Sequence, residues 1–380
     1  MRIVFLHHAN VCRGGIERML TAKANLLAEQ IGWDVVLLTY EQNGAPYPYS
    51  LSPKVKCVDL GVRLYSAYKA PLLMRHFKKK LLRKQLIDAI RCFLMSQKTD
   101  IIVCTDKDAH ELNALSKAHT TEKLLIEAHT GMVDHETQLQ QTHSSFRRII
   151  ARKDLWRLKK AVSCFDVLIA LTPEDAQCWQ LHVHTVVIPN SLPQYPTKPA
   201  DLSVEKKRVI AVGRLDYQKG QDLLLKAWNQ VEKQYPNWHL DIYGDGRERE
   251  ALNTQIIALN LKTVTIHSAL ADIYSEYLKS DFLVCSSRWE SFGLVLIEAM
   301  SCGIPVISFN CDNGPRNIIQ DGEDGLLARN GDIDDLAAKT IYLIENREVR
   351  QAMGSQARLH AARFKENSIL TRYVNLYQQL

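Results

Sequence analysis

The sequence predicts an α/β protein built from two Rossmann-like domains, each with a parallel sheet. Short runs rich in Val and Ile alternate with longer amphipathic stretches along the whole chain, which is the pattern of repeated βα units. The chain has 380 residues, whereas one domain usually holds about 100–200. We therefore expect two domains with a cleft between them.

Ten apolar runs are candidate strands, five in each half of the chain. The first five are Arg2–His7, Val35–Tyr40, Asp100–Cys104, Leu124–Glu127 and Val167–Leu171. The second five are Arg208–Val212, His239–Tyr243, Val264–His267, Asp281–Cys285 and Val306–Phe309. Open parallel sheets bind ligands at the carboxyl ends of their strands, so the loops after these runs are where we expect functional residues.

A proline-rich segment separates the two halves. It contains four prolines from Pro189 to Pro199 and has no apolar periodicity, which is typical of a linker. We predict an N-terminal domain at 1–190, a linker at 191–206, a C-terminal domain at 207–363 and a final helix at 364–380. A return of this helix to the N-terminal domain is left open.

The composition indicates a soluble, well-cored protein, with 46% hydrophobic and 24% charged residues. No apolar run approaches the ~18 residues of a membrane-spanning helix, and the run Ile3–Leu6 is too short for a secretory signal. Nine cysteines without a CxxC pair argue against a disulfide framework and a structural zinc site. We expect a cytoplasmic protein with reduced cysteines and no cofactor.

The surplus of positive over negative residues is confined to the first half. Residues 1–190 contain 26 Lys and Arg against 18 Asp and Glu, and residues 191–380 contain 22 against 24. This surplus indicates an acidic partner for the first half. Three kinds of partner fit: an anionic membrane surface, a phosphorylated acceptor and a nucleic acid. Segments 75–95 and 147–160 are basic and amphipathic, as suits helices lying on an anionic leaflet, although ordinary solvated helices would show the same pattern.

A glycine pair follows the first expected strand. Gly14 and Gly15 precede an amphipathic stretch over 16–30, and glycine at such a turn lets the backbone and the helix N–H groups approach a phosphate. A tight turn without a ligand is the alternative. The full GxGxxG fingerprint is absent, so no dinucleotide is indicated.

Two further loops carry charged residues. GRLDYQKG places Arg214 and Lys219 after the strand Arg208–Val212. Two cations in such a loop suit the binding of a diphosphate leaving group. The alternative is that both are ordinary solvated surface residues. In the segment SSRWESFGLVLIEAMSCG, Glu290 precedes a helix expected over 292–301 and Glu298 lies inside it. Glu298 has apolar neighbours, so it is either an acceptor for two ribose hydroxyls or a partly buried structural acid.

Four motifs carry a resemblance to a known family. GRLDYQKG, ESFGLVLIE, GIPVISF and GPRNIIQDGEDGLL, in this order, resemble glycosyltransferase family 4, which has the GT-B fold of two Rossmann-like domains. The resemblance covers essentially the whole chain and is strongest from Val209 to Ala328. It implies transfer of a hexose or N-acetylhexosamine from a nucleotide-sugar, a UDP-sugar first of all, to a glycan or lipid-linked acceptor in cell-surface polysaccharide or lipopolysaccharide biosynthesis.

The resemblance also implies a role for each matching residue. Arg214 and Lys219 would hold the donor diphosphate. Glu298 would accept hydrogen bonds from the ribose hydroxyls, and Glu290, as a catalytic residue, would contact the ring hydroxyls of the transferred sugar.

Other matching positions lie at the helix start and in the first half. The backbone of Phe292, Gly293, Leu294 and Val295 would line the phosphate and the sugar, with Gly14 and Gly15 closing over them from the other domain. His129, in IEAHTG, matches a histidine that the family places near donor sugar and acceptor, and is the second expected catalytic residue. Without the resemblance, the residues alone would favour a functional role for His129 only slightly over that of an ordinary loop histidine.

The family retains the anomeric configuration, and the resemblance favours attack on the face that the diphosphate leaves. Asp106 and Asp108 come nearest to a metal-binding DxD motif but do not form a convincing one. We therefore expect no metal, and we expect Arg214 and Lys219 to supply the positive charge in its place. Asn317 stands two residues after Pro315, where the family commonly has an acid, which puts the sugar contacts of that loop in doubt.

Two alternatives stay open at this point. A sugar-nucleotide 2-epimerase shares the architecture, although the ordered motifs favour transfer. A non-catalytic module binding a membrane or nucleic acid explains the basic half but leaves Glu290 and Glu298 unexplained. We expect an enzyme at the inner face of the membrane, attached peripherally, with no nucleic-acid partner.

Overall fold

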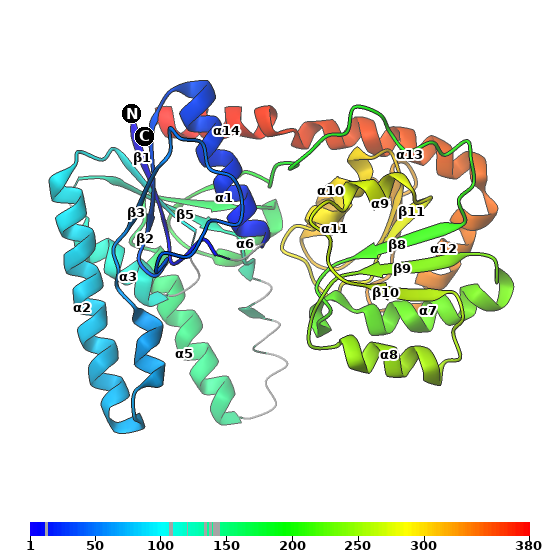
Figure 1. The fold of residues 1–380 in the computed structure, drawn as a ribbon, viewed down its shortest axis with the longest axis horizontal. Coiled ribbons are helices and arrows are strands. Elements are labelled where there is room, and N and C mark those ends of the chain that lie inside the picture. The colour runs from blue at the N-terminus through cyan, green and yellow to red at the C-terminus, as the bar shows by residue number, and fades with distance from the viewer. Residues whose placement is uncertain (12–13, 106–108, 120, 133–134, 137–138, 140–144) are drawn as a thin grey trace. The chain divides into compact units, whose positions relative to one another are not determined.

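The computed structural model describes residues 1–380 except 12–13, 106–108, 120, 133–134, 137–138 and 140–144. The chain divides into two compact units (Figure 1). Unit 1 consists of Met1–Pro189 and Ile369–Leu380, and unit 2 consists of Asn190–Ser368. The segment 191–206 thus belongs to unit 2, where the Ala200 amide donates to the Cys302 carbonyl at 2.7 Å.

Unit 1 is a seven-stranded parallel sheet with the strand order β3-β2-β1-β4-β5-β6-β7. Its strands are β1 (Arg2–His7), β2 (Asp34–Thr39), β3 (Lys56–Asp59), β4 (Ile101–Cys104), β5 (Lys123–Ala128), β6 (Val167–Ala170) and β7 (His184–Val187). Its helices are α1 (Gly15–Leu26), η1 (Leu27–Ile31), η2 (Leu64–Lys69), α2 (Leu72–Ser96), α3 (Ala109–Ala118), α5 (Ser145–Val162), α6 (Pro173–Trp179) and α14 (Glu366–Gln378).

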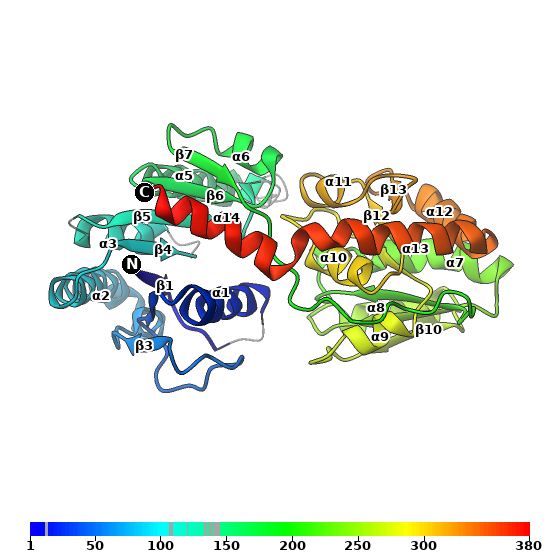
Figure 2. The ribbon, with the colours of Figure 1, turned by 90° about the horizontal axis from the view of Figure 1, so that it is seen from above.

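Both faces of the unit 1 sheet are covered by helices, which is why β4 and the interior of β1, residues 3–6, are apolar. One core contains side chains of α2, α3 and α5. The opposite core contains side chains of α1, η1 and α14, including Ile369, Leu370 and Tyr373. Figure 2 shows α14 lying beside α1 on this face. The last helix of the chain is therefore part of the unit that also holds the first strand.

Unit 2 is a six-stranded parallel sheet with the order β10-β9-β8-β11-β12-β13. Its strands are β8 (Arg208–Val212), β9 (His239–Tyr243), β10 (Val264–His267), β11 (Phe282–Cys285), β12 (Val306–Phe309) and β13 (Gly325–Ala328). Its helices are η3 (Tyr217–Lys219), α7 (Gln221–Gln234), α8 (Arg249–Ala258), α9 (Tyr274–Leu278), α10 (Leu294–Ser301), α11 (Gly314–Ile318), α12 (Ile333–Glu345), α13 (Arg347–Ala361) and η4 (Ala362–Phe364).

All ten expected strands are present, each within one residue of its expected ends. Three observed strands, β3, β7 and β13, were not among them. All three lie at sheet edges. Strand β3 is largely exposed and β7 is largely half-buried, so these two lack the continuous apolar run of a buried strand. The helix expected over 292–301 begins only at Leu294, because Gly293 has a φ of 100° and ends the preceding turn.

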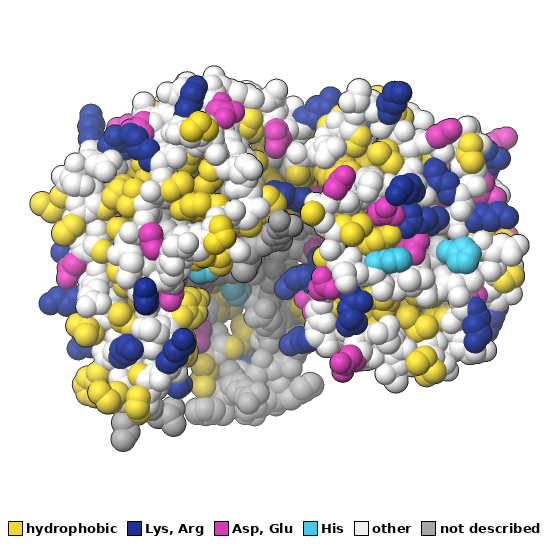
Figure 3. Space-filling view, in the orientation of Figure 1, with side chains coloured by type: hydrophobic (Ala, Val, Ile, Leu, Met, Phe, Trp, Pro, Cys, Tyr) yellow, Lys and Arg dark blue, Asp and Glu magenta, His cyan; other side chains and the backbone are white. Residues whose placement is uncertain are grey.

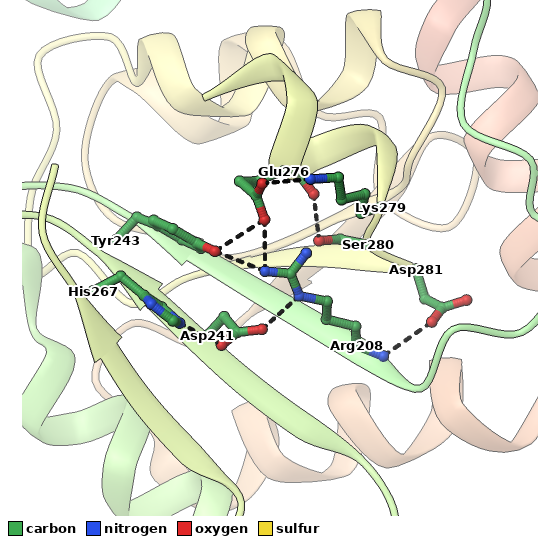
Figure 4. A network of polar contacts seen from close by, with 8 residues as sticks. All are labelled: Arg208, Asp241, Tyr243, His267, Glu276, Lys279, Ser280 and Asp281. Atoms are coloured by element: carbon green, nitrogen blue, oxygen red, sulfur yellow. Dashed lines mark hydrogen bonds and ion pairs between the residues drawn. The ribbon is translucent and has the colours of Figure 1, made fainter. Parts of the chain in front are cut away.

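A network of polar side chains joins three strands of unit 2 to a helix (Figure 4). The Arg208 guanidinium contacts Asp241 at 2.5 Å and Glu276 of α9 at 2.7 Å. Tyr243 donates to Glu276, and His267 contacts Asp241 at 2.6 Å while its ring stacks on Tyr243. These bonds fix α9 on the sheet beside β8, the strand that leads into the predicted diphosphate loop.

Candidate functional site

The loop after β8 is held in shape by capping and by a left-handed glycine. Asp216 caps η3 by accepting from the Lys219 amide at 3.2 Å. Gly220 has a φ of 63°, and a Cβ at this position would overlap the carbonyl oxygen of Ser286. Only glycine permits both the conformation and the close approach, so this residue presses the loop after β8 against the segment that follows β11.

The close approach brings Lys219 to Glu290. The Lys219 ammonium lies 2.5 Å from Oε1 of Glu290, and the Ser287 hydroxyl donates to the same oxygen at 2.6 Å. The side chains of Lys219 and Glu290 are only 17% and 6% exposed. Burial alone would lower the pKa of Lys219, but the charge of Glu290 raises it above its ordinary value. The ammonium therefore remains charged at neutral pH.

The second oxygen of Glu290 differs from the first. Within the part of the chain that the structure describes, no side chain or amide donates to Oε2 of Glu290. A carboxylate has about four acceptor positions. Glu290 is thus fixed through one oxygen, and the acceptor positions of its other oxygen are filled by no donor of the described residues.

Arg214 is placed differently from Lys219, although both come from the same loop. Its side chain is 69% exposed and contacts Asp216 at 3.3 Å and Gln218 at 2.9 Å. The two expected diphosphate cations thus differ in environment. Lys219 is a buried, ion-paired cation, whereas Arg214 is a surface cation whose guanidinium is accessible to a ligand.

The start of α10 combines a left-handed glycine with a close backbone contact. Gly293 precedes the helix at a φ of 100°, and a Cβ on Gly314 would overlap the Phe292 carbonyl. Phe292 is buried, while Leu294 and Val295 are half-buried. The first N–H groups of a helix lack partners inside it and attract anions. The expected phosphate contact of residues 292–295 is compatible with this geometry.

Glu298 lies one turn further along α10 and is 3% exposed. It accepts a hydrogen bond from the Tyr277 hydroxyl of α9 at 3.2 Å. Burial and the nearby Glu298 charge raise the pKa of Tyr277 well above its ordinary value, so the phenol keeps its proton. The structure thus gives the buried acid a hydrogen-bond partner within unit 2.

Gly14, Gly15 and His129 belong to unit 1. Gly14 is the N-cap residue of α1, and its carbonyl accepts from the Arg18 amide at 3.2 Å. Glu17 in the first turn lies close to Gly14, so this helix start already has a carboxylate beside it. His129 follows β5, and its Nε2 lies 3.1 Å from Oε2 of Glu127.

Three residues of these environments were missed from the sequence: Ser287, Lys23 and Glu127. Glu127 contacts both His129 and Lys23. Its signal was an acid between Ile126 and Ala128 in an apolar strand, since such a charge needs a buried partner. Lys23 gave no comparable signal, because a lysine in an amphipathic helix is usually exposed.

Two other expectations concern metals and the Asn317 loop. Asp106 and Asp108 lie outside the described residues, and the described residues contain no cluster of three His, Cys, Asp or Glu side chains suited to a metal. The Asn317 amide donates to the Asn313 carbonyl at 2.7 Å, so this side chain is partly used within its own short helix.

Family and sequence comparisons agree on a class of enzyme. Residues 197–360 match the family described as Glycosyl transferases group 1. An uncharacterized glycosyltransferase of Haemophilus influenzae is 27% identical over 352 residues, 91% of each chain. The amylovoran biosynthesis glycosyltransferase AmsD of Erwinia amylovora is 34% identical over 170 residues, 44% of this chain and 47% of that protein.

Solved structures are similar over the full length. Sucrose-phosphate synthase from Thermosynechococcus elongatus has a TM-score of 0.81 at 21% identity, over 100% of this chain and 98% of that one. HepE from Anabaena, solved with UDP and glucose, has a TM-score of 0.74 at 21% identity, over 100% and 99%. The expected GT-B fold is confirmed, and the family match supports glycosyltransferase activity.

Proposed function

We propose that the protein is a retaining, metal-independent glycosyltransferase that uses a UDP-sugar to extend a glycan or lipid-linked acceptor in cell-surface polysaccharide biosynthesis. The observation that carries the proposal is Glu290, fixed by Lys219 and Ser287 through one oxygen and open at the other. The range 197–360 that matches the group 1 family contains every proposed donor residue of unit 2.

The donor roles follow from charge and placement. Arg214, Lys219 and the start of α10 stabilise the diphosphate as it leaves, because fixed positive charge and helix N–H groups favour the developing negative charge. Lys219 suits this role because its ammonium stays protonated beside Glu290. Glu290 accepts from a hydroxyl of the transferred sugar, Glu298 from the ribose, and Gly14 and Gly15 approach the phosphate.

The donor nucleotide and the pathway are inferred from similar proteins. HepE was solved with UDP and glucose, which favours uridine as the nucleotide. AmsD is named for the biosynthesis of amylovoran, which favours a polysaccharide product. The proposed transfer of a hexose or N-acetylhexosamine, lipopolysaccharide as a further product and the assignment to glycosyltransferase family 4 rest on the motif resemblance.

We also propose that unit 1 attaches peripherally to an anionic membrane at the cytoplasmic side. The described part of the chain has no helix long and apolar enough to cross a bilayer. Large apolar side chains are nevertheless exposed on two of its helices, namely Met74, Phe77 and Leu81 of α2, and Ile149, Ile150 and Trp156 of α5. Lysine and arginine side chains surround them in both sequences.

The two helices present most of these groups at the same end of unit 1, with Trp156 further along α5. Both α2 and α5 contribute to one core and flank α3, and both begin at the lower end of the unit in Figure 1. Figure 3 shows hydrophobic and cationic side chains intermingled at that end over α2. Apolar groups within a cationic rim suit insertion among anionic headgroups.

A donor screen tests the proposed reaction. The purified protein is incubated with a panel of nucleotide-sugars and a native lipid extract, with and without a chelator. Transfer predicts a lipid-extractable product heavier by one sugar, with the anomeric configuration of the donor and undiminished yield under chelation. A 2-epimer of the donor without transferred product would show a 2-epimerase instead.

A further inference from the structure

A chain of buried polar and charged side chains lies in unit 1, outside the donor residues of unit 2. It runs from Tyr373 of α14 through Lys23 of α1 and Glu127 of β5 to His129. We propose that Lys23 and Glu127 are positioning residues that hold the His129 ring with its proton on Nε2, which leaves Nδ1 as a hydrogen-bond acceptor. The proposal rests on the proposed function, with His129 as the catalytic residue near the donor sugar and the acceptor that the motif resemblance implies.

Strand geometry explains why Glu127 and His129 meet. Alternate side chains of β5 enter opposite cores, with Ile126 in one and Leu125 in the other. Glu127 shares the face of Leu125, which α1 and α14 cover. His129 continues the same alternation just beyond the strand, and its side chain is 6% exposed.

Lys23 supplies the charge that keeps the buried carboxylate ionised. Its ammonium contacts Oε1 of Glu127 and lies 4.1 Å from the centre of the Tyr373 ring, an attractive cation–π arrangement. Burial lowers the pKa of Lys23, and the charge of Glu127 opposes that effect. Neither charge would be stable in this core without the other.

The charge state of Glu127 determines the tautomer of His129. Burial alone would raise the pKa of Glu127, but Lys23 and then His129 lower it to about 2. The carboxylate is therefore an acceptor only, and its Oε2 must receive a proton from Nε2 of His129, 3.1 Å away. A neutral imidazole with its proton on Nε2 has a lone pair on Nδ1.

The free nitrogen is what gives this arrangement a function beyond stability. Among the described residues nothing bonds to Nδ1 of His129. A buried ion pair alone would only fasten α1 and α14 to the sheet. A carboxylate that also dictates the tautomer sets which ring atom can accept from a hydroxyl of the donor sugar or the acceptor.

Nitrogen NMR on the full chain measures the tautomer directly. Protein labelled with 15N-histidine is compared with His129→Gln, whose missing signals assign the ring. We expect a protonated Nε2 and an unprotonated Nδ1 at neutral pH. In the Lys23→Met, Glu127→Gln double variant, which removes both charges but keeps the volumes similar, we expect a mixture of tautomers. A proton on Nδ1 in the parent overturns the proposal, whether or not the variant folds.

Kinetics separate positioning from a structural role. We expect the double variant to transfer sugar with a kcat at least tenfold lower, a donor KM within about twofold of the parent, and an unchanged melting temperature within a few degrees. Tyr373→Phe keeps the ring over Lys23 and should behave as the parent. An active parent together with an equally active double variant refutes positioning, whereas a parent without transfer in the donor screen refutes the proposed function and leaves the tautomer result valid.

Discussion

Lys219 and Glu290 join two loops of unit 2 through a contact of 2.5 Å between the ammonium and Oε1. Each residue is the main partner of the other in a largely buried place, and Ser287 adds one hydrogen bond to the carboxylate. Removal of either partner leaves the other charge uncompensated. The two residues must therefore be analysed as a pair, with separate effects on stability and on ligand binding.

We predict that Lys219→Met weakens UDP binding at least tenfold, because it removes the buried cation next to the proposed diphosphate. It should also cost roughly 3 kcal/mol of stability, since it leaves Glu290 unpaired. Glu290→Gln should bind UDP within about threefold of the parent but transfer sugar at least a hundredfold more slowly. Calorimetric titration with UDP and urea unfolding give both quantities.

The control for this pair is Arg329→Met, which removes an exposed cation of the same unit, 78% exposed in its side chain. It should leave UDP affinity within about twofold of the parent. Unchanged UDP affinity in a folded Lys219→Met variant would remove Lys219 from the donor site.

Glu298 has two candidate roles that a change in the ligand can separate. If it accepts from ribose hydroxyls, the parent should bind UDP about tenfold more tightly than 2′-deoxy-UDP, since a hydrogen bond to a charged group contributes about 1.5–3 kcal/mol. Glu298→Gln should bind both ligands with more nearly equal affinity. Tyr277→Phe removes the hydroxyl that donates to Glu298 and should keep most of the discrimination. If the parent and Glu298→Gln prefer UDP over 2′-deoxy-UDP by the same factor, Glu298 has a structural role and does not bind the ribose.

Gly220→Ala should disrupt the site through the backbone. Alanine at a φ of 63° costs about 1–2 kcal/mol, and its Cβ would overlap the Ser286 carbonyl. Gly331→Ala is a matched control, because Gly331 has a φ of 76° with no heavy atom near the Cβ position. We expect Gly220→Ala to lower the stability by at least 1 kcal/mol more than Gly331→Ala and to reduce UDP affinity, whereas Gly331→Ala retains it. Similar losses in both variants would show that the loop contact is unimportant.

Membrane attachment can be tested on the exposed apolar groups of α2 and α5. Phe77 and Trp156 are 75% and 60% exposed. We predict that the parent co-sediments with vesicles containing anionic lipid and less with neutral ones, and that Phe77→Glu combined with Trp156→Glu lowers the bound fraction at least fivefold. Ile257→Glu is the control, since Ile257 of unit 2 is 79% exposed. The proposed surface would be contradicted if Ile257→Glu lowered the bound fraction as much as the double variant does. It would also be contradicted if the parent bound to neither kind of vesicle.

The sequence predicted the parts of this molecule that local patterns determine. The strands buried on both faces were found because their apolar runs are continuous, and Lys219 and Glu290 were found through their motifs. Their mutual ion pair was not, because it depends on the approach of Gly220 to Ser286, a tertiary contact. Lys23 and Glu127 are 104 positions apart, and no local pattern joins a helix lysine to a strand acid through the intervening fold.

The Arg208 network predicts a specific loss of stability in acid. Burial would raise the pKa of Glu276, but hydrogen bonds from Lys279, Arg208 and Tyr243 lower it to about 2, below the value near 4.5 of an unfolded chain. A depressed folded pKa means that the unfolded state binds more protons, so the contribution is complete above about pH 5 and is lost as the pH falls toward 2. Its upper limit is about 3 kcal/mol.

The measurement is the urea midpoint of unit 2, monitored by hydrogen exchange of β8–β10 peptides at several pH values between pH 7 and pH 3. At pH 7 the urea midpoint of Glu276→Gln should be lower than that of the parent. The difference between the two midpoints should narrow as the pH falls, because the variant has no carboxylate to protonate at this position. Glu250→Gln changes an exposed glutamate of α8. Its urea midpoint should differ little from that of the parent at every pH. A difference in urea midpoint between Glu276→Gln and the parent that stays constant down to pH 3 would mean that the ionised form of Glu276 does not stabilise the sheet.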